Sequence, residues 1–145
     1  MALLYLDTSA LTKLVVHERE TEALRAFLST HERGRLVSSA LVRTELRRAV
    51  LRFADRGDVT PAQAQAAAQE AVALLRRLDL VRLGAAVLDR AGRRPPAQLR
   101  SLDAIHLATA LALGPRLDAV VAYDDRLASA SRDAGLAVQA PSASA

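Results

Sequence analysis

The sequence contains no cysteine and no tryptophan, and Lys13 is its only lysine. Without cysteine, the chain can form no disulfide, no thiolate zinc site and no cysteine nucleophile. No apolar run approaches the roughly 20 residues that a membrane-spanning helix needs, so we expect no membrane contact. Met1 leads straight into an apolar run without a basic leader, which predicts no signal peptide. Together with the missing cysteines, this favours a reducing, cytoplasmic location.

The residues that are present favour one folded domain with a basic surface. Of the 145 residues, 51% are hydrophobic, which is enough for a substantial core. The formal net charge is +4 and the sequence pI is about 10.6. Arginine binds phosphate through two parallel hydrogen bonds, so a polyanionic partner is one explanation of this charge. A genome that favours Ala and Arg codons is another, and net charge alone does not decide between them.

Short apolar runs alternate with helical patterns along the chain. We predict strands at 3–6, 35–38, 80–83, 119–123 and 136–138. We predict helices at 8–16, 17–28, 40–54, 61–78, 85–91, 101–113 and 125–134. Ser38 or Ser39, Thr60 and Ser101 are suited to cap three of these helices. The alternation predicts an α/β fold with a parallel sheet flanked by helices, in one domain over 1–140 that a loose tail over 141–145 follows.

Asp7 ends the first predicted strand and is followed by two hydroxyl residues, Thr8 and Ser9, at the start of a helix. In parallel α/β sheets, ligands bind at the carboxyl ends of the strands, so this aspartate is a candidate site residue. Its alternative role is to cap the helix, although Thr8 or Ser9 could do that instead. The local sequence leaves both roles open.

Glu45 lies beside the apolar stripe of its helix, in line with Leu41 and Ala49. A carboxylate is rarely placed there without a partner, because its burial is costly. It is therefore a second candidate site residue. The alternative is a structural salt bridge to Arg48 or Arg52.

Two further acids complete the candidate set. Asp103 falls in the first turn of the helix predicted at 101–113, where it could also serve only to complement the helix dipole. His106 follows three residues later and is interpreted first as a structural histidine, with a supporting role to the site or metal ligation as the alternatives. Asp124 directly ends the strand at 119–123, so we prefer it to Asp125, which could cap the next helix.

Acids at the ends of strands and on adjacent helices can meet in one cleft. Clustered carboxylates repel one another unless a cation joins them. A ligand set of hard oxygens without cysteine favours Mg²⁺ or Mn²⁺ over zinc. A basic protein with such a pocket fits hydrolysis of phosphodiester bonds by a metal-activated water. We find no serine–histidine–acid set and no glycine-rich phosphate loop that would compete with this hypothesis.

Four motifs, taken in their order, resemble those of the PIN-domain ribonucleases, and specifically the VapC toxins of bacterial toxin–antitoxin pairs. They are the stretches Leu6–Leu11, Ser39–Glu45, Leu102–Ala110 and Val121–Leu127. The resemblance covers almost the whole chain and implies a three-layer α/β/α PIN-like domain with a central, mainly parallel sheet. The family pattern maps its acidic metal-binding residues onto Asp7, Glu45, Asp103 and Asp124.

The same resemblance implies an endoribonuclease that depends on Mg²⁺ or Mn²⁺, is usually a homodimer, and is held inactive by a small VapB antitoxin. One departure from the family pattern is Ala122, where many members carry Thr or Ser two residues before the last acid. This removes a hydroxyl that could orient a water. Thr8, Ser9 and Asp125 remain as candidates to support the metal ligands.

Three arginines near the predicted cleft are candidates for RNA contact. Arg93 and Arg94 precede a Pro-Pro pair, and Arg100 comes just before the helix of Asp103. The alternative is an ordinary solvated loop, since the chain is rich in arginine. With only two Tyr and two Phe, an extensive base-stacking platform is not expected.

Two other functions are alternatives to nuclease activity. A catalytically inactive PIN-like module that binds RNA or a partner is the main alternative, and the presence of all four acids argues against it. A phosphoaspartyl enzyme using Asp7 would need a second acid nearby and a lysine downstream to balance the phosphate charge. Lys13 is the only lysine and lies in the first helix, which does not suit that role.

Overall fold

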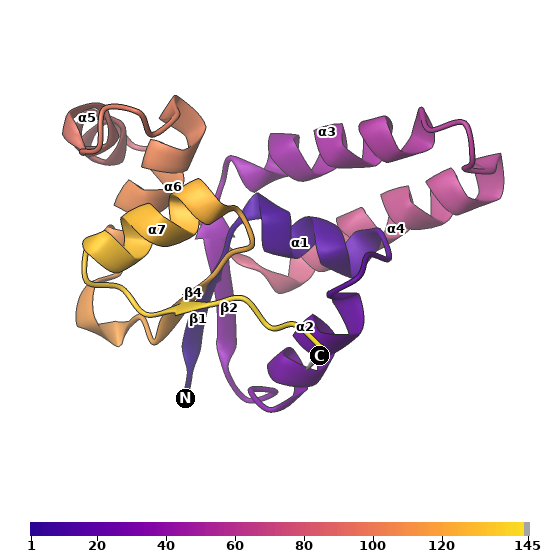
Figure 1. The fold of residues 1–145 in the computed structure, drawn as a ribbon, viewed down its shortest axis with the longest axis horizontal. Coiled ribbons are helices and arrows are strands. Elements are labelled where there is room, and N and C mark those ends of the chain that lie inside the picture. The colour runs from indigo at the N-terminus through magenta and orange to yellow at the C-terminus, as the bar shows by residue number, and fades with distance from the viewer. Residues whose placement is uncertain (144–145) are drawn as a thin grey trace.

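A five-stranded parallel sheet forms the centre of the protein, which is described over residues 1–143 in a computed structural model (Figure 1). Its strands lie in the order β3-β2-β1-β4-β5, and every neighbouring pair is parallel. They are β1 (Leu3–Leu6), β2 (Arg35–Ser39), β3 (Asp79–Val81), β4 (Ala119–Val121) and β5 (Val138–Gln139). The predicted α/β class is confirmed, although β4 and β5 are shorter than the sequence pattern predicts.

Seven α-helices within residues 1–143 connect and cover these strands. They are α1 (Thr8–Val15), α2 (Thr21–Ser29), α3 (Val42–Ala54), α4 (Pro61–Arg77), α5 (Ala85–Arg93), α6 (Ser101–Ala112) and α7 (Asp125–Asp133), with a short 3₁₀ turn η1 (Gly114–Arg116) before β4. The prediction that a helix begins at residue 17 is wrong. Lys13 binds Glu18 and Glu20 and keeps these acids in the turn before α2.

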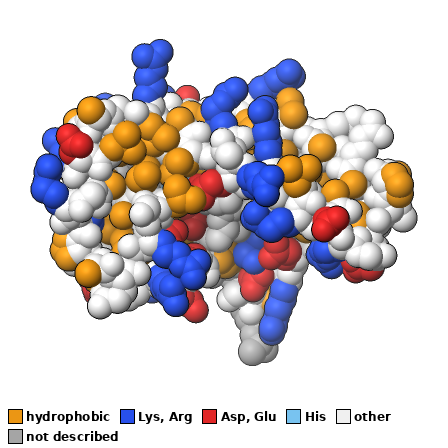
Figure 2. Space-filling model, turned by 90° about the horizontal axis from the view of Figure 1, so that it is seen from above, with side chains coloured by type: hydrophobic (Ala, Val, Ile, Leu, Met, Phe, Trp, Pro, Cys, Tyr) orange, Lys and Arg blue, Asp and Glu red, His pale blue; other side chains and the backbone are white. Residues whose placement is uncertain are grey.

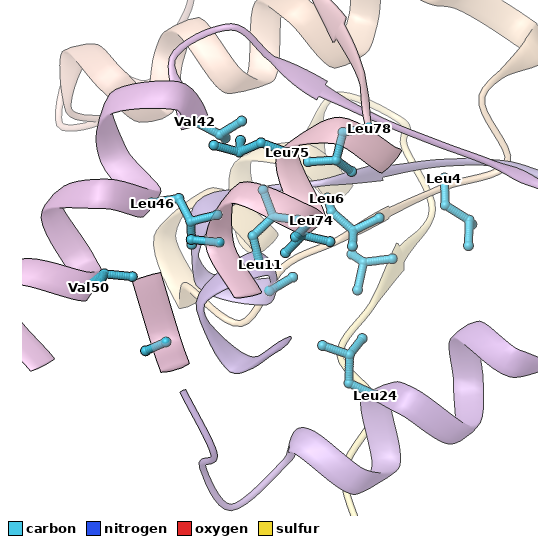
Figure 3. Packing of buried hydrophobic residues seen from close by; sticks show 14 of the residues in the cluster. Leu4, Leu6, Leu11, Leu24, Val42, Leu46, Val50, Leu74, Leu75 and Leu78 are labelled. Atoms are coloured by element: carbon cyan, nitrogen blue, oxygen red, sulfur yellow. The ribbon is translucent and has the colours of Figure 1, made fainter. Parts of the chain in front are cut away.

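Alternate residues of each strand point to opposite faces of the sheet, and each face is covered by its own helices. Leu4 and Leu6 of β1 join a buried cluster that includes side chains from α1 to α4 (Figure 3). Tyr5 points the other way, into a second cluster with Leu107 of α6 and Leu127 of α7. Helix α5 packs on the outside of α6. The three-layer α/β/α arrangement is thereby confirmed.

The strand order reverses between β1 and β4. From β1 the chain moves outward to β2 and β3, and then returns across the sheet to β4 on the other side of β1. The first residue after β1, Asp7, still donates its backbone N–H to the carbonyl of Val121 in β4 at 3.2 Å. The carboxyl ends of β1 and β4 are therefore neighbours at the switch point, which is where open α/β sheets bind ligands.

The helix starts show where local sequence signals succeed and where they fail. Thr60 and Gln63 form the predicted cap of α4 as a reciprocal capping box, with Pro61 as the first helical residue. Ser101 is already inside α6, so its predicted capping role is wrong. The predicted capping of α3 by Ser38 or Ser39 is also wrong. The Ser38 hydroxyl instead donates to the Leu6 carbonyl, and the Ser39 hydroxyl accepts from the Leu41 amide.

The division into a domain over 1–140 and a tail over 141–145 stays a prediction. Pro141 is tied to the fold, since its carbonyl accepts a 2.7 Å hydrogen bond from the Tyr123 hydroxyl. Residues 144–145 lie outside the described part of the chain. No helix among residues 1–143 combines the length and the apolarity that are needed to cross a membrane.

Candidate metal centre at the switch point

Asp7 is almost completely buried, with 3% of its surface exposed, at the junction between β1 and α1. Its Oδ1 accepts hydrogen bonds from the Ala10 amide at 3.0 Å and from the Ser9 hydroxyl at 2.6 Å. Asp7 therefore caps α1 itself, which was the alternative role considered for it, and neither Thr8 nor Ser9 is the cap. Both hydrogen bonds fall on one oxygen, so capping the helix and binding a ligand do not exclude each other.

Burial is the main cause that raises the pKa of Asp7 to about 6, because the charged form has lost its hydration. The hydrogen bonds from Ser9 and Ala10 act in the opposite direction and limit the increase. The negative charge of Asp124 raises the pKa of Asp7 further. A carboxylate held in this state gains more from a nearby cation than an exposed one does.

Asp124 is exposed and stands at the start of α7, just beyond β4. It caps α7, since its Oδ1 accepts a 2.9 Å hydrogen bond from the Leu127 amide. The suggestion that Asp125 caps this helix is therefore wrong; Asp125 is an exposed residue of the first turn. Asp124 is connected to the Asp7 turn through Ser9, whose hydroxyl oxygen accepts from the amides of Tyr123 at 2.8 Å and Asp124 at 3.3 Å.

Glu45 projects from the first turn of α3 and is half-buried. Its Oε1 accepts hydrogen bonds from the Thr8 hydroxyl at 2.8 Å and from Nε2 of His106 at 2.7 Å. Burial pushes the pKa of Glu45 upward, but the hydrogen bonds from His106 and Thr8 outweigh it, so that the pKa is lowered overall. The positive charge of Arg52 adds a smaller effect in the same direction. The alternative of a structural salt bridge to Arg48 or Arg52 is therefore wrong, since the partners of Glu45 are His106 and Thr8.

A chain of hydrogen bonds supports Glu45 from the core. The Tyr5 hydroxyl lies 2.6 Å from Nδ1 of His106, and both residues are buried. A carboxylate only accepts, so Nε2 of His106 carries a proton and donates it to Glu45. Burial raises the pKa of Tyr5, which keeps the phenol protonated and able to donate a hydrogen bond. The chain Tyr5–His106–Glu45 therefore fixes the orientation of the acid.

Sequence reasoning missed Tyr5. The signal for it was a phenol within an otherwise aliphatic strand, since a buried tyrosine hydroxyl needs a partner. His106 was interpreted first as structural, with support of the site as an alternative. Its contact with Glu45 means that His106 is both a structural residue and a support of the candidate site.

Asp103 lies half-buried in the first turn of α6. Burial is the main cause that raises its pKa, and the negative charges of Asp124 and Glu45 raise it further. Arg100, which precedes α6, acts in the opposite direction. Since Asp7 also responds to Asp124, the four acids form one electrostatically coupled group at the switch point.

The chemistry of these donors fits a hard divalent cation. All four candidate ligands are carboxylates, and the hydrogen bonds to Asp7, Glu45 and Asp124 each use a single oxygen of the carboxylate. Among residues 1–143, however, no three His, Asp or Glu side chains stand close enough together to hold a metal ion as placed. A cation would have to draw the carboxylates inward against their mutual repulsion.

One face of the molecule is hollowed near its centre (Figure 2). Figure 2 shows acidic side chains at the bottom of this depression and basic side chains on its rim, with apolar side chains gathered over the left half. Arg93 and Arg94 line a separate hollow of about 250 Å³ between α5 and α6. Of the three arginines that are candidates for RNA contact, Arg100 is the one whose charge reaches an acid of the site, Asp103.

The sequence matches a known family over most of its length. The model of the PIN domain family matches residues 4–133. Ribonuclease VapC46 of Mycobacterium tuberculosis (strain ATCC 25618 / H37Rv) is 49% identical over 143 residues, which cover 98% of this chain and 100% of the relative. Ribonuclease VapC47 of M. tuberculosis (strain CDC 1551 / Oshkosh) is 41% identical over 144 residues, which cover 97% and 98% of the two chains.

Two solved structures share the fold at low sequence identity. The first, VapBC2 from Rickettsia felis bound to a DNA fragment from their promoter, aligns with a TM-score of 0.68 and 14% identity over 94% of this chain and 97% of that one. The second is M. tuberculosis VapC20, described as a Sarcin-Ricin loop cleaving toxin. It aligns with a TM-score of 0.63 and 18% identity over 92% of this chain and 95% of that one.

Proposed function

The chain belongs to the PIN-domain family and, within it, to the VapC ribonucleases, and from this membership we propose that it is a toxin endoribonuclease whose four acids hold a divalent cation. VapC ribonucleases are generally dependent on divalent metal, and the oxygen ligands favour Mg²⁺ or Mn²⁺ for this chain. The reaction is hydrolysis of an RNA phosphodiester bond, in which water adds to phosphorus and one P–O bond breaks.

The observation that carries the proposal is the coupling of the acids. Asp7, Glu45, Asp103 and Asp124 come from four separate parts of the chain, yet Asp124 raises the pKa of both Asp7 and Asp103. A fold gains no stability by bringing like charges together at its ligand-binding edge. A cation that binds between them offsets this cost and supplies an activated water and positive charge beside the phosphate.

The protein's own residues orient the acids. Ser9 holds Asp7 and the backbone of Asp124 at a fixed separation. Thr8 and His106 hold one oxygen of Glu45, which directs the other away from the protein partners. These contacts support our proposal that Thr8 and Ser9 orient the ligands, whereas exposed Asp125 is the weaker candidate for that role.

The proposed partners follow from the family and the surface. An antitoxin of the VapB type is supported by the solved VapBC2 complex of the same fold. A homodimer is supported by Leu88 of α5 and Leu102 of α6, which are 42% and 48% exposed on two helices that pack together. We propose a cytoplasmic location, because the proposed substrate is cellular RNA.

Incubation of the purified protein with total bacterial RNA tests the proposal. We expect new RNA ends at defined positions with Mg²⁺ or Mn²⁺ and none with EDTA. Asp7→Asn should abolish the cuts while the far-ultraviolet circular dichroism spectrum stays that of the wild type. Cutting that persists in this variant would contradict the assignment of Asp7. If no RNA is cut under any metal condition, the inactive binding module becomes the better hypothesis.

A further inference from the structure

A hollow of about 640 Å³ opens beside Asp124, one of the four acids. Thr8, Ser9 and Asp124 line it at the end that faces the acids. Its other end is the C-terminal part of α3 and the turn after it. We call this cavity the α3 hollow; its remaining lining residues include Lys13, Arg52, Phe53, Arg56 and Tyr123.

The positive charge of the α3 hollow comes from its arginines rather than from Lys13. Lys13 is buried and bound by Glu18 at 2.8 Å and by Glu20 at 2.9 Å, so its charge is already neutralised. Arg56 pairs with Asp58 at 3.2 Å. Both of these side chains are more than half exposed, so a phosphate can replace the aspartate at little cost.

Arg52 stands between Arg56 and the acids. Among residues 1–143 no carboxylate forms an ion pair with it, and its charge lowers the pKa of Glu45 from seven residues further along α3. Seven residues are two helical turns, or about 10 Å along the axis. Glu45, Arg52 and Arg56 therefore form a line that begins at the candidate metal centre and leads away from it along α3.

We propose that the α3 hollow binds the nucleotide that adjoins the scissile phosphate, with Arg52 and Arg56 on its phosphate groups. This proposal rests on the proposed nuclease function. The guanidinium group binds phosphate oxygens through paired hydrogen bonds. Phe53 offers an apolar wall for the sugar or base, and the Arg56 guanidinium carbon lies 5.6 Å from its ring centre.

The surroundings favour RNA over a protein segment in the α3 hollow. Hydroxyl-bearing and charged side chains provide about half of its lining surface, whereas a docking groove for a helix is lined mainly by apolar side chains. The alternative RNA contact at Arg93 and Arg94 lies in a hollow whose lining includes none of the four acids. The strand is therefore expected to leave the site along α3.

The test compares two double variants of the same helix. One is Arg52→Ala/Arg56→Ala; the control is Arg43→Ala/Arg47→Ala, which removes two arginines that are also exposed but lie outside the α3 hollow. The substrate is a synthetic RNA that spans a cut mapped with the wild type in total RNA. Cleavage is measured as kcat and KM over a range of salt concentrations, and Mn²⁺ binding by calorimetry.

We expect KM to rise about 10- to 100-fold in Arg52→Ala/Arg56→Ala, with kcat and Mn²⁺ binding little changed. The dependence of log(kcat/KM) on log salt should become shallower by about 0.7 for each lost phosphate contact. The control should behave like the wild type in both respects. A wild type that cuts no RNA would overturn the proposed function, and with it the basis of this proposal.

Two outcomes would overturn the nucleotide site alone. One is equal KM values and equal salt dependence in the two double variants while the wild type cuts RNA. The other is unchanged RNA cleavage together with loss of binding to the cognate antitoxin in Arg52→Ala/Arg56→Ala, which would assign the α3 hollow to a protein partner.

Discussion

Replacing Asp7 by asparagine should stabilise the metal-free protein at neutral pH. Burial is the main cause that raises the pKa of Asp7 from 3.8 to about 6. The stability that the protonated group provides is fully present below pH 3.8 and is lost as the pH rises through 6. A shift of about 2 units corresponds to about 3 kcal/mol. Asparagine avoids this loss and still offers an oxygen to the Ala10 amide, because it is also a good helix cap.

The assay is urea unfolding followed by circular dichroism, in EDTA, at several pH values between 4 and 7.5. Asp7→Asn should match the wild type near pH 4 and become more stable by about 1 to 3 kcal/mol above pH 6. The control is Asp89→Asn, at an exposed position of α5, which should show no such trend. A variant that is less stable than the wild type at pH 7.5, or a difference that does not change with pH, would refute the argument.

The remaining predictions concern the metal and the residues that orient its ligands. Mn²⁺ affinity, measured by calorimetry, should fall by up to about tenfold per pH unit below pH 6, because protons then compete for Asp7; a flat profile would contradict this. His106→Gln should weaken Mn²⁺ binding and cleavage by about 10- to 100-fold, because Glu45 loses a 2.7 Å hydrogen bond. Tyr5→Phe should also weaken Mn²⁺ binding and cleavage, but less strongly, since it removes only the donor behind His106. An effect as large as that of His106→Gln would show that Tyr5 acts by another route.

Periodicity and turn chemistry were sufficient to predict most of the fold. The strands are short apolar runs between strong helical patterns, and such runs have few alternatives in an α/β chain. The errors lie at boundaries that distant residues decide. The start of α2 depends on Lys13, which binds acids that would otherwise look like the first turn of the helix. The pairing between strands likewise makes β4 and β5 shorter than predicted, and no local sequence pattern indicates where this pairing ends.

The four acids were predicted from local position and from the resemblance, but their partners were not. Asp124 is connected to Asp7 by the Ser9 hydroxyl, and Glu45 meets His106 from another helix. Both contacts join segments far apart in the sequence, so they depend on the packing of α1, α3, α6 and α7. The arginines of the α3 hollow were missed for the same reason, since Arg52 was considered only as a salt-bridge partner of Glu45.

The Ser9 hydroxyl has a consequence for how the site responds to a cation. This one group donates to Asp7 and accepts from the amides of Tyr123 and Asp124. Its hydrogen bonds therefore link the turn after β1 directly to the turn after β4. A cation that draws Asp7 inward therefore also pulls on the start of α7. Metal binding should slow hydrogen exchange at the Tyr123 and Asp124 amides, and Ser9→Ala should uncouple the two turns so that each aspartate responds separately.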